Sequence, residues 1–254
     1  MGIAEALAKV TDPYERQARL WPALLAGLPL FALITLLYAP AINVGENLAM
    51  LAASCGGLYL LTNLCRDLGK RLESRLFESW GGKPTTQLLR HRDTTIEGVT
   101  KRRYHSFLAA KIGEPFPTKD EEAADPRAAD ELYQSAVRWL LNQTRDQSQF
   151  SLLLNENIAY GYRRNALGLK PIAILVAVGS LAWTLATQGV FTTNSATTFV
   201  NIESLVALPA NALLSCGVSV VMLATWLFFF TKARVRNAAF TYAELLLRAC
   251  DVLK

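Results

Sequence analysis

The most regular pattern along the chain is a set of long apolar runs that contain no charged residue. Four such runs lie at 20–42, 48–65, 171–190 and 204–231. As a helix, the first run would extend about 34 Å, which is enough to cross a hydrocarbon layer about 30 Å thick. The pattern therefore predicts an all-α polytopic membrane protein with four transmembrane helices.

The interval between the second and third runs is polar, and its apolar residues recur at helical spacing. Gly81 and Gly82 are expected to end one helix and Pro84 to begin the next, because proline suits the first helical turn. Gly113 is expected to close a helix over 99–112. Further helices are expected from 126 and over 148–167, and no convincing strand is expected in this interval.

These elements divide the chain into four parts. They are an N-terminal segment with the first two spans (1–65), a helical module (66–170), the last two spans (171–231) and a C-terminal helix (232–254). Within the module, 66–111 holds eleven cations against five acids, whereas 112–131 holds two against seven. Residues 112–131 are therefore interpreted as an acidic linker, and because residues 113–126 contain three prolines we expect that stretch to be a mobile loop.

The positions of the cations predict the orientation in the membrane. The module and both terminal segments contain all 26 Lys and Arg residues, and the two remaining connections contain none. Because Lys and Arg near span ends stay on the cytoplasmic side, both termini and the module are expected to be cytoplasmic.

Composition restricts the class of protein further. A hydrophobic fraction of 52% and a mean hydropathy of +0.21 exclude a disordered chain and argue against a purely soluble one. The four cysteines, Cys55, Cys65, Cys216 and Cys250, lie in or beside spans and show no metal-like spacing. With only two histidines and no catalytic constellation, we expect no metal, no cofactor and no enzymatic activity.

The basic part of the module carries the strongest local signal. Its cations follow a predicted helix start and are interleaved with aromatic residues, a combination that suits a polyanion such as nucleic acid. The spacing is not that of a P-loop, since Pro84 stands where Ser or Thr is required. An equally good interpretation is attraction to anionic lipid headgroups. The candidate ligand-binding residues are Trp80, Lys83, Arg90, Arg92, Lys101, Arg102, Arg103 and Tyr104.

Two stripes of polar residues recur every four positions inside the predicted spans. The candidate pore-lining residues are Asn211, Ser215 and Ser219 in the fourth span, and Ser180, Thr184 and Gln188 in the third. Such stripes would suit an aqueous path in an oligomer, and the alternative is close packing of helices through interhelical hydrogen bonds. A further cluster before the third span, 155–165, is interpreted as structural.

Two spans, an insert with ESWGGKPTT (78–86) and LRHRD (89–93), and two further spans together resemble the Hailong type of anti-phage defence membrane effector. The resemblance lies in organisation over most of the chain. It implies a bacterial inner-membrane protein that forms an oligomeric ion channel. It also implies a single-stranded DNA oligomer as the ligand that holds the channel closed, and a nucleotidyltransferase as the partner that makes it.

Two functions therefore remain open from the sequence. The first is a ligand-gated channel, surrounded by membrane lipids, whose basic module senses an anionic ligand. The second is a non-conducting membrane anchor that recruits a protein partner through the same module.

Overall fold

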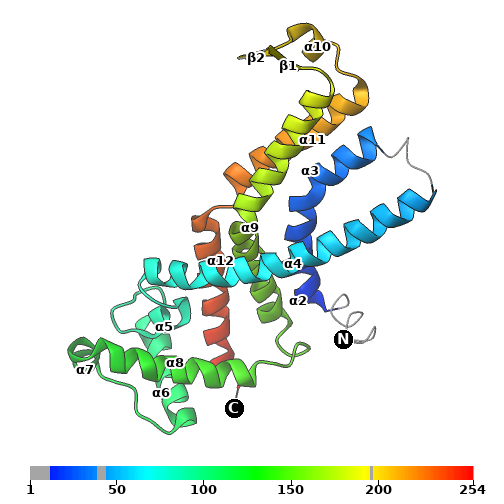
Figure 1. The fold of residues 1–254 in the computed structure, drawn as a ribbon. Coiled ribbons are helices and arrows are strands. Elements are labelled where there is room, and N and C mark those ends of the chain that lie inside the picture. Colours follow the sequence, from blue (N-terminus) through cyan, green and yellow to red (C-terminus); the bar gives the residue numbers. More distant parts are fainter. Residues whose placement is uncertain (1–11, 39–43, 195–196, 254) are drawn as a thin grey trace. The chain divides into compact units, whose positions relative to one another are not determined.

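The computed structural model describes residues 12–38, 44–194 and 197–253; within these ranges the side chains of 44–52, 54, 192–194 and 197–198 are not described (Figure 1). Helices account for about 81% of the structure, which confirms the all-α class. The chain divides into two compact units. The span unit comprises Met1–Arg71 and Tyr162–Thr231, and the helical module comprises Leu72–Gly161 and Lys232–Lys254.

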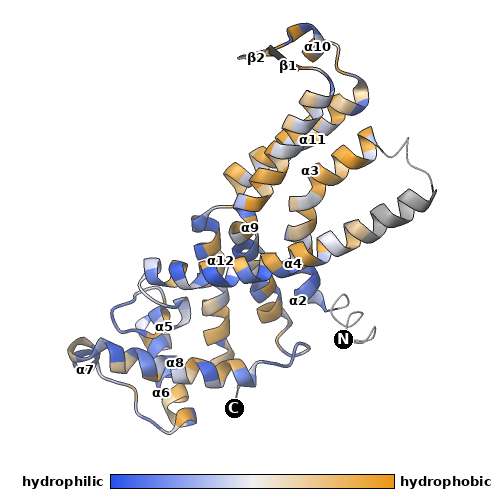
Figure 2. Ribbon diagram, viewed as in Figure 1, coloured by the Kyte–Doolittle hydropathy of each residue, from blue (hydrophilic) through white to orange (hydrophobic). Residues whose placement is uncertain are grey.

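The span unit contains most of the apolar helices. Its elements are α2 (Pro13–Glu15), η1 (Arg16–Leu20), α3 (Trp21–Leu37), the first part of α4 (Val44–Trp80), the second part of α9 (Ser151–Thr187), β1 (Phe191–Asn194), β2 (Thr197–Val200), α10 (Ile202–Val206), α11 (Ala210–Ala224) and η3 (Thr225–Phe229). Both η1 and η3 are π-helical turns. Apolar residues run along the length of α3 and α11 (Figure 2).

Three helical stretches are long and apolar enough to cross a membrane: Pro13–Leu37, Ser151–Thr187 and Ala210–Phe229. They correspond to the first, third and fourth predicted spans, and they support a location in a membrane. The second predicted span, 48–65, lies in α4, which is not among them. Because much of its first half lies outside the described side chains, the second span stays a prediction.

The connection between α9 and α11 contains two short strands that the sequence did not predict. There β1 and β2 pair as an antiparallel hairpin, with Phe191 opposite Val200. From the sequence this connection was expected only to lie outside the cytoplasm, because it contains no Lys or Arg. Gly189, at a φ of 70°, allows the chain to leave α9 and enter the hairpin.

Helices α4 and α9 cross at a point where neither has a side chain. A Cβ atom on Gly168 would lie 2.6 Å from the backbone nitrogen of Gly69 and 2.8 Å from the carbonyl carbon of Leu68. Asn165, one turn before Gly168, is fully buried and donates from Nδ2 to the backbone oxygen of Ala18, at 2.8 Å. Because Ala18 lies in η1, this crossing joins three segments of the span unit.

A second polar side chain of α9 holds the other π-helical turn. Lys170 donates from Nζ to the backbone oxygens of Leu227 and Phe230, at 3.0 and 3.1 Å. These carbonyls lie at the end of η3, where the helix has no further amide to offer them. The side chain of Lys170 therefore caps the C-terminal end of Ala210–Phe229, a helical stretch apolar enough to cross a membrane, and it does so beside the buried rings of Trp226 and Phe230.

The helical module is built on one shared hydrophobic core. Its elements are the end of α4, α5 (Pro84–Leu89), α6 (Gly98–Ile112), α7 (Lys119–Ala124), α8 (Pro126–Gln143), the beginning of α9, α12 (Lys232–Arg248) and η4 (Ala249–Asp251). Leu88, Leu108, Tyr133, Leu140 and Leu246 are buried together in this core. The C-terminal helix, assigned from the sequence as a separate part, thus belongs to the module.

The expectation of a mobile loop over 113–126 was wrong at 119–124, which form α7, whereas the helix expected from Pro126 is present as α8. Thr118 and Glu121 form a capping box that starts α7, and Asp125 caps α8 at Pro126. Glu122 is buried, and its carboxylate accepts from the backbone nitrogen of His91 at 2.8 Å and from the hydroxyl of Tyr133 at 2.7 Å. The acidic residues that suggested a loop instead cap two helices and provide a buried hydrogen-bond acceptor.

Substitution of Gly168 by Ala should destabilise the span unit, because the new Cβ would meet the backbone of α4 and not a flexible side chain. Overpacking of this kind costs about 1–3 kcal/mol. Gly179→Ala in the same helix is the matched control, since its Cβ would meet nothing within 4 Å. Thermal unfolding of the purified protein in detergent should show a lower Tm for Gly168→Ala only. Equal values for both variants would refute the close crossing.

Candidate ligand site in the helical module

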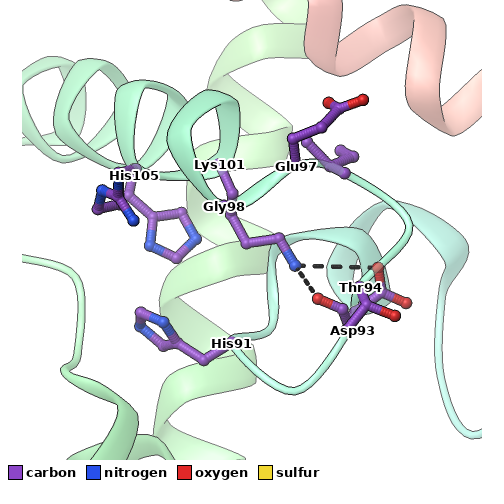
Figure 3. Close-up of a pocket in the computed structure, with 9 residues that line it drawn as sticks. His91, Asp93, Thr94, Glu97, Gly98, Lys101 and His105 are labelled. Carbon is purple, nitrogen blue, oxygen red and sulfur yellow. Dashed lines mark hydrogen bonds and ion pairs between the residues drawn. The ribbon is translucent and has the colours of Figure 1, made fainter.

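The basic segment predicted to bind a ligand folds around a pocket of about 330 Å³ in the helical module. The loop between α5 and α6 and the first two turns of α6 line the pocket, and the residues that matter for its chemistry are His91, Asp93, Glu97, Lys101, Arg102 and His105. Figure 3 shows the two imidazole rings on one side of the pocket and the Lys101 ammonium reaching Asp93 on the other.

The two histidines meet edge to face, with ring centroids 4.9 Å apart. Nε2 of His105 lies 2.7 Å from the backbone oxygen of Leu89, and Nε2 of His91 lies 2.9 Å from that of Pro117. A carbonyl oxygen only accepts hydrogen bonds, so Nε2 is the protonated nitrogen in both rings. Burial lowers the pKa of His105 from 6.5 to about 4. At neutral pH its Nδ1 is therefore available as an acceptor.

Lys101 closes the loop that forms one wall of the pocket. Its side chain is buried, and Nζ donates to the backbone oxygens of Arg90 and Asp93 at 2.7 and 2.5 Å. The Asp93 carboxylate lies 3.8 Å away. Burial lowers the pKa of Lys101, and the nearby Asp93 and Glu122 carboxylates act in the opposite direction. The Lys101 ammonium is thus already hydrogen-bonded to the loop between α5 and α6.

Arg90 holds α5 against α8. Its Nε and Nη2 donate to the two carboxylate oxygens of Asp130, at 2.8 and 2.6 Å, and Nη1 donates to the backbone oxygen of Gly81 at 2.9 Å. The hydrogen bond with Asp130 raises the pKa of Arg90. Gly82 has a φ of 130° and lies against the same guanidinium. Arg90 is buried, and the structure gives it a role in assembling the module.

Four other predicted ligand residues also have partners inside the module. Arg103 and Tyr104 donate to the carboxylate of Asp251, at 2.9 and 3.0 Å. Trp80 packs against Phe240, and Lys83 donates to Gln134 at 2.8 Å. Arg103 and Lys83 are exposed, so the contacts they make lie at the surface. Most of the predicted ligand-binding side chains therefore form contacts that hold α4, α6, α8 and η4 together.

Arg92 and Arg102 are the two predicted residues whose guanidinium groups are exposed and form no hydrogen bond or ion pair with the described residues. Arg102 lines the pocket, and its Nη1 lies 3.7 Å from where a Cβ on Gly98 would be. The first amide hydrogen bond within α6 runs from Lys101 to Glu97, and no side chain caps the helix. The amides of 98–100 therefore lack intrahelical partners beside a free guanidinium, an arrangement that attracts anions.

The sequence did not identify His91, Glu97 or His105 as part of this site. A signal was present, because Gly98 at a helix start and two histidines fourteen positions apart all fall within the basic segment. The acids Asp93 and Glu97 also line the pocket, so its charge is mixed and not purely basic. Among the described residues, no group of three or more His, Cys, Asp or Glu lies close enough to hold a metal ion.

The two polar stripes of the span unit meet each other across α9 and α11. Ser180, Thr184, Ser215 and Ser219 are all buried. The hydroxyls of Thr184 and Ser215 lie 3.2 Å apart, and Thr184 and Ser219 also donate to carbonyls one turn back in their own helices. Asn211 is exposed and donates to the backbone oxygen of Leu36 at 3.1 Å, and Gln188 is half-buried. Within one chain the stripes form a packed seam, and a pore-lining role stays a prediction.

No protein-family model, no curated protein and no solved structure matches this chain. The resemblance to anti-phage membrane effectors therefore rests on the organisation of the sequence.

Replacement of Arg90 should distinguish a structural cation from a ligand-binding one. Arg90→Met leaves the Asp130 carboxylate and the Gly81 carbonyl without their partner, and loss of charged hydrogen bonds costs about 1.5–3 kcal/mol. Arg92→Met, at an exposed position without such bonds, should change stability by less than about 0.5 kcal/mol. Urea unfolding monitored by circular dichroism compares them. Similar losses in both variants would contradict the assignment of Arg90.

The lowered pKa of His105 predicts that the module becomes less stable in mild acid. With a pKa near 6.5 when unfolded and about 4 when folded, the unfolded chain takes up the proton first as pH falls. The contribution is therefore complete above pH 6.5 and is lost as pH falls towards 4. In His105→Gln, which keeps a donor for the Leu89 carbonyl, Tm measured across this range should depend less on pH than in the wild type. An unchanged pH dependence would show that other groups control it.

Proposed function

We propose that this protein is a membrane effector of the ligand-gated channel class, in which the helical module senses an anionic ligand and controls the state of the spans. The ligand class is a short single-stranded DNA oligomer, bound through Arg92, Arg102 and the free amides at the start of α6. The cellular role is anti-phage defence in a bacterial inner membrane, with cytoplasmic termini and a nucleotidyltransferase as the enzyme that supplies the ligand.

The observation that supports this function most strongly is the continuity of α4 and α9. Each is a single helix of 37 residues, and each contributes one part to the span unit and the other to the helical module. In addition, only Phe230 and Thr231 separate η3 from α12. A ligand that rearranges the module thus acts on segments that run without a break into candidate membrane spans.

The buried seam between α9 and α11 suggests how such a protein is kept closed. In the closed state the hydroxyl groups bond each other, and the apolar residues beside them keep water out of the seam. If the helices separate, the same hydroxyl groups can bond water. Met222 is buried one turn beyond Ser219 in α11. In an oligomer, separation of Thr184 from Ser215 would place hydroxyls along a hydrated path.

A non-conducting membrane anchor is the second candidate, and a specific observation favours it. Six of the eight predicted ligand residues are engaged within the module, and four of the six predicted pore residues are buried within one chain. An anchor would use the exposed face of the module for a protein partner and would need no path through the spans.

Ion efflux from liposomes containing the purified protein separates the two functions. A channel should release trapped ions, and a short single-stranded DNA oligonucleotide should suppress the release, with less effect as salt increases because phosphates release counterions. The double variant Arg92→Glu, Arg102→Glu should escape suppression. Arg127→Glu with Arg138→Glu, two exposed cations of α8, is the matched control and should remain suppressed. Liposomes that never release ions would support the anchor instead.

A second substitution pair tests the seam. Thr184→Val keeps the volume of the side chain and removes the hydroxyl that contacts Ser215, so it should reduce efflux several-fold without loss of expression. Thr187→Val, an exposed position one turn further along α9, should leave efflux unchanged. Equal efflux from both variants would exclude the seam as part of the conducting path.

A further inference from the structure

The segment between α9 and α11 carries several exposed large apolar side chains among the residues that the structure describes. It consists of the β1–β2 hairpin and the single-turn helix α10. Phe191 and Val200 are directly opposed in the hairpin, so their side chains share one face, and Phe199 lies on the other face. All three are exposed. An isolated two-stranded hairpin is marginally stable in water, and this one presents apolar residues on both faces.

Helix α10 continues the same surface. Ile202, Leu205 and Val206 lie at positions i, i+3 and i+4 and therefore share one face, with exposed fractions of 70%, 42% and 82%. Glu203 lies beside this face, about 100° around the helix from Ile202, and is the one charged residue in 188–209. The turn is therefore amphipathic, although it is too short to be stable alone.

The position of the segment indicates what covers it. It connects the ends of two candidate membrane spans, Ser151–Thr187 and Ala210–Phe229, so the chain enters and leaves it at a membrane boundary. Close to the same end of α9, Trp183 donates from Nε1 to the hydroxyl of Tyr38, at 2.8 Å. Both rings are exposed, and Trp and Tyr are typical of the level where lipid headgroups meet acyl chains.

A second copy of the chain is a less suitable occupant. Stable protein interfaces use about 20–30 residues per side, whereas this surface offers six large apolar side chains on two short elements. A membrane interface has no such requirement, because an amphipathic segment needs only to place its apolar face below the headgroups and its polar face towards water.

We propose that the β1–β2 hairpin and α10 are a membrane-interface element that lies in the headgroup–acyl boundary and fixes the ends of α9 and α11 at that depth. Ile202 and Val206 face the acyl chains, and Glu203 faces water. The element is independent of any ligand of the helical module and rests only on the insertion of α9 and α11 in a membrane.

Spin labels on the full chain in phosphatidylcholine–phosphatidylglycerol vesicles test this proposal. Among the four cysteines, Cys65, Cys216 and Cys250 are buried and Cys55 is exposed, so Cys55→Ser gives a background with little labelling and serves as the blank. Val206→Cys and Ile202→Cys place labels on the apolar face of α10, and Glu203→Cys is the matched control. Power saturation with oxygen and with a water-soluble nickel chelate reports the surroundings of each label.

The expected result is high oxygen access and low chelate access at 206 and 202, with chelate access several-fold higher at 203. High chelate access at all three positions would place the element in water and overturn the proposal. Low access to both reagents, with spin–spin broadening between copies, would assign the surface to an oligomer interface and would also overturn it.

Discussion

The rest of this structure depends on the close approach of α4 and α9 at Gly69 and Gly168. At this point the two longest helices of the chain pass with backbone against backbone, and no other residue type fits at Gly168 without displacing α4. Asn165 uses the resulting space to reach the carbonyl of Ala18, so the entry to the first span is fixed by the same contact. In a membrane this matters because apolar burial provides no driving force between helices, and close packing with interhelical hydrogen bonds has to provide it.

The same logic explains how polar residues are distributed along α9. Asn165 and Lys170 each bond to carbonyls of a π-helical turn, in η1 and η3 respectively, and Thr184 bonds across to Ser215. π-Helical turns leave backbone groups without regular partners and often occur at functional sites. One helix thus provides partners to both of the spans that contain such turns. If ligand binding to the module changes the spans as we propose, α9 is the element that would transmit the change.

The sequence predicted the elements well where local rules determine them. Gly81, Gly82, Pro84, Gly113 and Pro126 mark helix ends as expected, because a positive φ or a proline ring acts on the backbone directly. The chemistry of the site was less predictable, since it depends on distant partners. Nothing near Arg90 in the sequence indicates Asp130, and nothing near Tyr104 indicates Asp251. A run of cations therefore suggested a surface for a polyanion, although several of these side chains form hydrogen bonds within the module. The same is true of 119–124, where composition suggested a loop and the capping box of Thr118 and Glu121 starts a helix.

The central claim is that occupation of the helical module changes the spans, and hydrogen–deuterium exchange of the full chain in lipid nanodiscs tests it most directly. Peptides that cover the start of α6 should become protected when a short single-stranded DNA oligonucleotide is added. Peptides that cover η3 and the Lys170 region of α9 should change their exchange at the same oligonucleotide concentrations. Protection confined to the module, with exchange around Lys170 and η3 unaltered at saturation, would contradict the claim.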